Sequence, residues 1–219
     1  MNTIAIIDYG AGNLRSVAKA FERSSRDYGI LVNIKVTSDI GIIAKADRIV
    51  FPGVGAFPDC RSWVDRVHGL YDVLERRVIH DSIPFLGICV GMQLMAKVGF
   101  EHMTTKGFSW IDGEVHRIIP KDKEKRQIYK VPLIGWSMLK FCTNYHPVLL
   151  GLQDGDHVYF LNSYAIRVHD TDQQLAITDY GGSICAIVGR NNMIGTQFHP
   201  EKSQAIGLRL IYNFIKWSP

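Results

Sequence analysis

Apolar residues in the first half of the chain form four short, nearly uninterrupted runs. These runs are TIAIID (3–8), ILVNIKV (30–36), RIVF (48–51) and IPFLGI (83–88). Runs that are rich in β-branched residues and lack polar alternation are typical of strands buried on both faces of a sheet. Between them lie amphipathic stretches of helical length, at 13–23, roughly 60–80, and 91–98. This alternation predicts βαβ units around a parallel sheet.

Strands follow one another in the second half, separated by short turns that contain Gly, Asn or Asp. We predict them at 113–119, 134–141, 157–166, 174–180, 183–190 and 193–198. Their spacing indicates hairpins and antiparallel additions to the sheet. A last helix is predicted at 203–217, because its apolar residues recur at helical spacing. We therefore expect an α/β fold, a three-layer sandwich with a central mixed and mostly parallel sheet.

Length and charge narrow the class of protein further. With 219 residues, 47% of them hydrophobic, the chain fits a single domain over 1–219. The net charge of +4 contains no run of five like charges, so we expect no nucleic-acid partner. The densest basic stretch, at 120–127, alternates in sign and reads as a solvated loop, with a partner-docking patch as the minority interpretation. The amino terminus resembles neither a signal peptide nor a membrane span, so we expect a cytoplasmic protein.

One of the four cysteines stands in a distinctive place, after an apolar run and between two glycines. In the stretch GICVG, Cys89 is flanked by Gly87 and Gly91. A nucleophile at a sharp strand-to-helix turn occupies a strained conformation and needs small neighbours. The first turn of the helix would favour the thiolate, and the N–H of Val90 would be an oxyanion donor. The alternative is that Cys89 is a small buried hydrophobic residue.

A nucleophilic thiol needs a base, and the stretch GTQFHPEKS at 195–203 offers one. Proline holds the preceding residue, His199, in an extended conformation, in which residues two apart project to the same side. Glu201 would then orient the imidazole of His199 toward the thiol. An ordinary surface turn is the alternative. Zinc could accept all three side chains, but the chain has no CxxC pair, so we expect no metal site.

A third stretch, FPGVGAF at 51–57, also follows a predicted strand. Glycines spaced by one residue let the backbone turn successive N–H groups toward an anion. Gly53, Val54 and Gly55 are therefore candidate oxyanion formers, provided that the loop converges with Cys89 at the carboxyl ends of the strands. A tight turn without function fits this stretch equally well when it is taken alone.

Taken together, DYGAGN, FPGVGAF, GICVGMQL, KGFSWIDGEV, VPLIGW, YFLNSYA and GTQFHPEKS resemble the class I glutamine amidotransferases, nearly end to end and in order. The PGVGAF and HPEKS forms resemble, more narrowly, the glutaminase subunits of histidine biosynthesis. The resemblance implies a flavodoxin-like fold, L-glutamine as substrate and no cofactor. It also implies a heterodimer with a HisF-type (β/α)8 cyclase or a related synthase subunit, which receives the ammonia.

The resemblance also implies roles for individual residues. Cys89 would attack glutamine, His199 would carry the proton and Glu201 would orient His199, while Gly53 to Gly55 would match the oxyanion loop. The positions that contact bound glutamine in the family correspond to Gln93, Glu101, Ser163 and Tyr164. For Gln93, a plain helix residue bonded to the backbone is an even alternative. Those that face the barrel correspond to Asn13, Trp136 and Lys202, although Trp136 also suits a core aromatic.

Three residues depart from the family pattern. Leu133 and Asn162 stand where the family usually has histidine, and Ser137 replaces an asparagine. They lie in segments associated with the barrel-facing surface, so they put the partner and pathway in question more than the chemistry. A paralogue that supplies ammonia for sugar amidation is therefore one alternative. A stand-alone cysteine peptidase or glutamyl hydrolase is another, and a non-catalytic binding module is a third.

Overall fold

The computed structural model describes residues 2–10, 13–121, 129–143 and 146–219. Most of the loop expected at 120–127 lies outside the described residues. The described part is built around an eight-stranded sheet with the order β2–β1–β3–β4–β14–β13–β12–β9. Its strands are β1 (Asn2–Ile7), β2 (Val32–Thr37), β3 (Arg48–Gly53), β4 (Phe85–Cys89), β9 (Lys140–Phe141), β12 (Gln174–Asp179), β13 (Ser183–Arg190) and β14 (Met193–Thr196).

The first five strands in this order run parallel to one another, and the remaining three are antiparallel additions. The mixed sheet of the sequence-based prediction is thus confirmed. β14 had been expected as an antiparallel addition, but it also pairs in parallel with β4 and so joins the two halves of the chain. The order 2-1-3-4 followed by β14 is the flavodoxin-like order, and it reverses direction between β1 and β3, the usual place for a ligand crevice.

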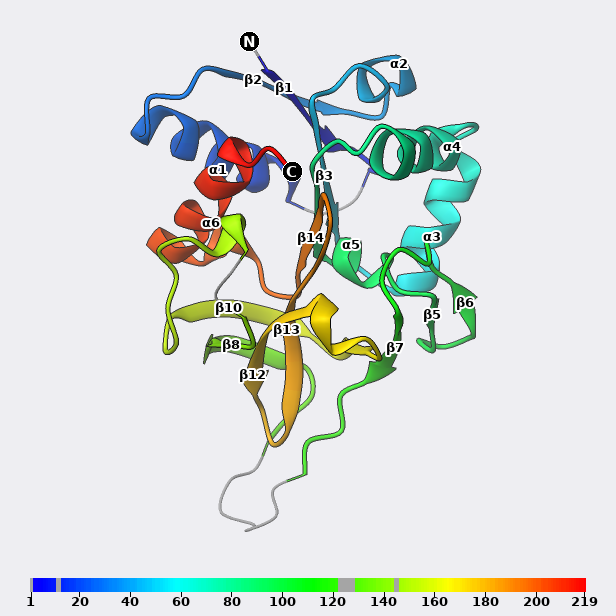
Figure 1. Ribbon diagram of the computed structural model, residues 1–219. Coiled ribbons are helices and arrows are strands. Elements are labelled where there is room, and N and C mark those ends of the chain that lie inside the picture. The colour runs from blue at the N-terminus through cyan, green and yellow to red at the C-terminus, as the bar shows by residue number, and fades with distance from the viewer. Residues whose placement is uncertain (1, 11–12, 122–128, 144–145) are drawn as a thin grey trace.

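Helices cover both faces of this sheet, which makes three layers (Figure 1). One face carries α1 (Leu14–Asp27) and α6 (Gln204–Lys216), and the other carries α2 (Ile40–Ile43), α3 (Phe57–Arg66) and α4 (Leu70–Glu75). The predicted last helix is confirmed, and its Leu210, Ile211 and Phe214 are buried. In the described part of the chain, no helix is long and apolar enough to cross a membrane.

Two expected helices are shorter than their sequence patterns suggested. The stretch near 60–80 is divided into α3, α4 and a π turn at Arg76–His80, because Gly69 takes a left-handed conformation (φ 78°) between α3 and α4. The stretch at 91–98 yields only α5 (Val90–Gln93), a single turn. Backbone N–H groups of residues 108–111 bind the carbonyls of residues 94–96, which a longer helix would have used.

Two smaller sheets extend the second half. β8 (Leu133–Met138) pairs with β10 (His157–Asn162), and a four-stranded sheet has the order β11–β7–β5–β6. Its strands are β11 (Tyr164–Val168), β7 (Gly113–Arg117), β5 (Val98–Gly99) and β6 (Thr105–Lys106). The prediction of one strand over 157–166 was wrong, because the chain crosses from one sheet to the other at Ser163, whose carbonyl accepts from the N–H of Ile118. Short 3-10 turns occupy Pro147–Leu149, Thr171–Gln173 and Pro200–Lys202.

Candidate active site

Cys89 is the last residue of β4 and the N-cap of α5, at the carboxyl edge of the parallel strands. Its backbone has φ 55° and ψ −111°, a strained conformation for a residue with a side chain. A Cβ added to Gly87 would lie 2.6 Å from the carbonyl oxygen of Gly91, and one added to Gly91 would lie 1.9 Å from that of Phe51. The two glycines are therefore required by close backbone contacts, as the sequence predicted.

These contacts make Gly91→Ala strongly destabilising. The added methyl group would clash with the backbone of Phe51, so α5 must move away from β3, at a cost of about 3 kcal/mol or more in the free energy of unfolding. Urea denaturation followed by tryptophan fluorescence measures the loss. Gly41→Ala is the matched control, because its φ is ordinary and the new Cβ would meet only the movable carboxylate of Asp39 at 3.1 Å. A cost for Gly91→Ala no larger than for Gly41→Ala would contradict the close packing.

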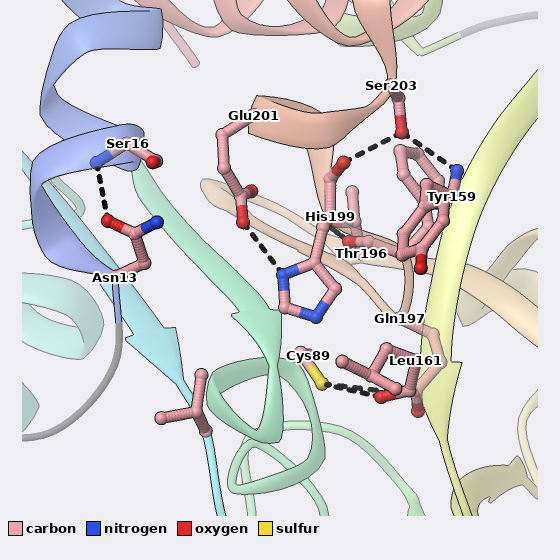
Figure 2. A network of polar contacts seen from close by, with 12 residues as sticks. Asn13, Ser16, Cys89, Tyr159, Leu161, Thr196, Gln197, His199, Glu201 and Ser203 are labelled. Carbon is pink, nitrogen blue, oxygen red and sulfur yellow. Dashed lines mark hydrogen bonds and ion pairs between the residues drawn. The ribbon is translucent and has the colours of Figure 1, made fainter. Parts of the chain in front are cut away.

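His199 lies beside Cys89 and is oriented by Glu201. The Nδ1 atom of His199 is 2.8 Å from Oε1 of Glu201, and both side chains are about 5% exposed. Figure 2 shows the imidazole ring between the carboxylate and the sulfur. His199 is extended (φ −95°, ψ 101°), as expected before a proline, but the contact forms because Pro200–Lys202 makes a 3-10 turn rather than because the chain stays extended.

The electrostatics of this group favour a protonated imidazole. Burial alone would lower the pKa of His199, but hydrogen bonds to Cys89 and Glu201, and their charges, raise it to about 9. The second oxygen of Glu201 has no hydrogen-bond partner among the described residues, so its charge is not neutralised elsewhere. At neutral pH the ring is therefore an acid that is ready to give up a proton.

The backbone of His199 is held by β10. Its N–H donates to the carbonyl of Tyr159 (2.9 Å), and its carbonyl accepts from the Ser203 hydroxyl (2.7 Å). The same hydroxyl accepts from the N–H of Tyr159 (3.0 Å), which closes the network in Figure 2. The backbone of His199 is thus fixed relative to β10 through both its N–H and its carbonyl.

A cavity of about 310 Å³ opens over the sulfur. It lies at the reversal point of the sheet, since it is lined by residues that follow β1, β3 and β4. The lining includes every residue predicted to act in catalysis, oxyanion binding or glutamine binding: Cys89, His199, Glu201, Gly53, Val54, Gly55, Val90, Gln93, Glu101, Ser163 and Tyr164. The structure therefore brings all of these together in one site, and the cavity falls within the common size range of small-molecule sites.

The candidate oxyanion donors are not equally placed. Val90 is the first residue of α5, where an N–H has no partner within the helix. The N–H of Val54, in contrast, already donates to the Tyr9 hydroxyl. Gly53 has a steric role, because a Cβ there would lie 2.2 Å from the nitrogen of Gly91.

The candidate substrate residues are fixed by hydrogen bonds. Gln93 is buried, and its Nε2 donates to the carbonyl of Tyr164 (2.9 Å) and to Oε1 of Gln197 (3.0 Å). One oxygen of Glu101 accepts from the N–H of Phe57 at the start of α3 (2.8 Å). Its other oxygen accepts no hydrogen bond within the described segments, on a residue that lines the cavity.

Sequence reasoning missed Gln197. This residue is fully buried, and its Nε2 lies 3.7 Å from the sulfur of Cys89, where it can donate to a thiolate. The available signal was a polar side chain two positions before His199, at the end of a predicted strand. Gln93, Gln197 and Cys89 thus form one chain of hydrogen bonds.

The three residues matched to the partner surface lie around the mouth of the cavity and on β8. Asn13 and Lys202 line the cavity, and Asn13 also caps α1 by accepting from the N–H of Ser16 (3.2 Å). Trp136 is 47% exposed on β8 and contacts Tyr159 edge to face, so it is not a core residue.

The side chains of the three residues that depart from the family pattern point into the protein. Leu133 and Asn162 are buried opposite each other in the β8–β10 pair, and Ser137 hydrogen bonds to Thr178 (2.7 Å). Their segments were expected at a partner surface, but their side chains do not lie on the exposed face of β8 and β10. They therefore bear on the packing beneath the exposed face of these strands, and on the cavity that Asn162 lines.

No group of three metal-ligating side chains occurs among the residues that the structure describes. All four cysteines are free thiols.

Comparison of the amino-acid sequence with known proteins identifies the family and several relatives of the chain. The sequence profile described as glutamine amidotransferase class-I matches residues 5–217. The chain is 50% identical over 219 residues to the imidazole glycerol phosphate synthase subunit HisH of Brucella suis, covering 99% of both chains. It is 49% identical over 216 residues to the HisH subunit of Rhodospirillum rubrum, again covering 99% of both.

Solved structures agree on the fold. A putative GMP synthase protein from Thermoplasma acidophilum superposes with a TM-score of 0.66 at 20% identity, covering 99% of this chain and 93% of the other. The crystal structure of another glutamine amidotransferase superposes with a TM-score of 0.68 at 19% identity, covering 97% of each chain.

Proposed function

Since the chain belongs to the class-I glutamine amidotransferase family, we propose that it is the HisH-type glutaminase subunit of imidazole glycerol phosphate synthase. Residues 1–219 act as one glutaminase domain, which hydrolyses L-glutamine to glutamate and ammonia for histidine biosynthesis. One observation carries this proposal: the imidazole of His199 lies between the Glu201 carboxylate and the sulfur of Cys89, over a cavity of sufficient size.

The proposed reaction begins with attack of the Cys89 thiolate on the carboxamide carbon of glutamine. Because the pKa of His199 is raised to about 9, its ring is protonated and gives its proton to the leaving nitrogen. Ammonia departs, and a glutamyl thioester remains on Cys89. The neutral ring then takes a proton from water, which attacks the thioester and releases glutamate and the thiolate.

Substrate is held by the other residues that line the cavity. The free oxygen of Glu101 is suited to the substrate ammonium group. Ser163 and Tyr164 border the cavity at the crossing between β10 and β11, where backbone polar groups can bind the α-carboxylate or amide. The Val90 N–H and the Gly53–Gly55 loop receive the oxyanion.

The relatives are named as subunits of a synthase, so the chain works with a partner subunit. We propose that this partner is a HisF-type (β/α)8 cyclase, which receives the ammonia. It would bind the outer face of β8 and β10, defined by Ile134, Trp136, Met138 and Leu161, which are 58%, 47%, 58% and 40% exposed. Such a group of exposed apolar side chains is characteristic of an interface.

The test measures glutamate release by the chain alone, with the cyclase, and with the cyclase and its own substrate. Release should be slow alone and should rise at each addition. The histidine pathway is contradicted if the cyclase neither binds nor raises the rate. Turnover of a glutamyl peptide library at full rate without any partner would favour a stand-alone peptidase or hydrolase instead.

Trp136→Ala should weaken cyclase binding by about 30-fold, because a central aromatic anchor contributes about 2 kcal/mol. Isothermal titration calorimetry gives the Kd. Leu31→Ala is the control, since Leu31 is 84% exposed but precedes β2, on another part of the fold. A loss of less than about threefold for Trp136→Ala, which by that energy scale is under about 0.7 kcal/mol, would remove this face from the interface.

A further inference from the structure

Side chains hold both backbone polar groups of Val54, in the middle of the candidate oxyanion loop. The N–H of Val54 donates to the hydroxyl of Tyr9 (2.5 Å), and the thiol of Cys60 donates to the carbonyl of Val54 (3.2 Å). The Tyr9 hydroxyl and the Cys60 sulfur also interact with each other. Three residues from three different segments thus form a ring of interacting polar groups.

The two side chains of this ring keep their protons at neutral pH. Tyr9 is 6% and Cys60 2% exposed. Burial is the main cause that raises the pKa of Tyr9, and it raises the pKa of Cys60 to about 12. The thiol therefore remains a donor to the Val54 carbonyl. The neutral hydroxyl can accept from the Val54 N–H while it donates to sulfur.

Packing holds the side chains of Tyr9 and Cys60 in place. The aromatic ring of Tyr9 stacks on Phe51 at 5.9 Å and meets Trp63 edge to face at 5.5 Å. Cys60 lies in the first part of α3, where its N–H donates to the carbonyl of Ala56 (3.1 Å). Neither side chain can follow Val54 if the loop moves, so a movement of the loop must break these bonds.

The hydrogen bond to Tyr9 has a direct consequence for catalysis. An N–H that donates to Tyr9 is not available to a developing oxyanion, although Val54 lines the cavity above Cys89. The loop can rearrange at Gly55, which has φ 88° and lies in open space, since a Cβ added there would meet no atom within 4 Å. Rotation there turns the peptide between Val54 and Gly55, whose carbonyl accepts from Cys60. The peptide before Val54 can turn its N–H toward the cavity once the bond to Tyr9 is broken.

We propose that Tyr9 and Cys60 are positioning residues that hold the Gly53–Gly55 loop in a resting conformation and so keep glutamine hydrolysis slow without a partner. This inference rests on the proposed function. It assigns the restraint to one hydroxyl and one thiol, each of which is bonded to a backbone group of Val54.

The test is the partner-free kcat for glutamate release by Tyr9→Phe, which keeps the aromatic packing and removes the acceptor. We expect kcat to rise about tenfold, the effect of losing one hydrogen bond that favours the resting state. The KM should stay within about twofold, because that single bond restrains the loop and does not bind substrate. The rate with cyclase and its substrate should be unchanged, so stimulation by the partner falls about tenfold.

Cys60 supplies an independent variant and a rescue. Cys60→Ala should also raise the partner-free kcat, whereas Cys60→Ser retains a donor and should return it toward the wild-type value. Tyr71→Phe and Cys185→Ala are matched controls, since each removes the same group from α4 or β13, away from the loop. Both controls should leave the partner-free kcat unchanged.

A residue with a purely structural role would lower the melting temperature without raising kcat. An unchanged or lower partner-free kcat in both Tyr9→Phe and Cys60→Ala would therefore overturn the inference. If a variant fails to fold, hydrogen exchange of residues 53–55 in the wild type decides: exchange should be slow alone and faster in the complex with the cyclase substrate. Equal exchange rates would overturn it. A wild type that is never stimulated refutes the proposed function instead.

Discussion

Cys89→Ala abolishes glutamate release, with a loss of about 10⁴-fold or more in the rate with the partner, because the thioester cannot form without the sulfur. That sulfur is held in a strained turn, beside the imidazole and at the base of the cavity. Coupled detection of glutamate by glutamate dehydrogenase measures the loss. The fold should be retained, since alanine fits where cysteine did.

Cys185→Ala is the matched control for this prediction. Its sulfur is equally buried but lies in β13 and bonds to the carbonyl of Ile187 (3.7 Å). Glutamate release by this variant should stay close to the wild-type rate. If Cys89→Ala kept even a tenth of the activity, the nucleophile would have to be another group, and the proposed chemistry would be excluded.

His199→Asn lowers the rate by about 10³- to 10⁴-fold, because both proton transfers lose their carrier. In the wild type the pKa of His199 is raised to about 9, so the acid form is present below that pH and is lost above it. The rate of the wild type should therefore fall as the pH rises through about 9. Asparagine is close in size and neutral, so the variant separates charge from packing.

Alkylation by iodoacetamide reads the same charge without turnover. In the wild type the protonated ring of His199 stabilises the thiolate of Cys89, so carbamidomethylation of Cys89 at about pH 7, followed by mass spectrometry of its peptide, should be faster than in His199→Asn. Equal rates in the two proteins would show that the ring carries no charge next to the sulfur.

The free energy of unfolding should also depend on the protonation of His199. A histidine whose pKa is raised by folding stabilises the protein fully below its ordinary value of 6.5, and this contribution is lost as the pH rises through about 9. Removing His199 should therefore flatten the dependence of stability on pH between these values.

The fold was predictable from the sequence where a local pattern is compatible with only one kind of structure. Uninterrupted apolar runs indicated the parallel strands, and the glycines around Cys89 indicated a tight turn between backbones that lie close together. The juxtaposition of Cys89, His199 and Glu201 was predictable because the cysteine between glycines and the His-Pro-Glu stretch each follow a predicted strand of the same sheet.

The errors arose where distant segments competed for backbone groups. Residues 94–96 have a helical pattern, yet their carbonyls bind the N–H groups of residues 108–111, which no local pattern reveals. The strand expected over 157–166 has suitable residues throughout, but its two halves find partners in different sheets. Gln197, Tyr9 and Cys60 escaped notice because their roles depend on contacts with residues far away in the sequence.

The attachment of the imidazole to β10 uses only main-chain atoms of Tyr159. Any residue except proline could supply the same N–H and carbonyl at that position. The side chain there, which points toward Trp136 and Lys202, is thereby free to change as a partner's surface changes. One strand can thus adapt its outer contacts over evolution while the catalytic base behind it stays in place.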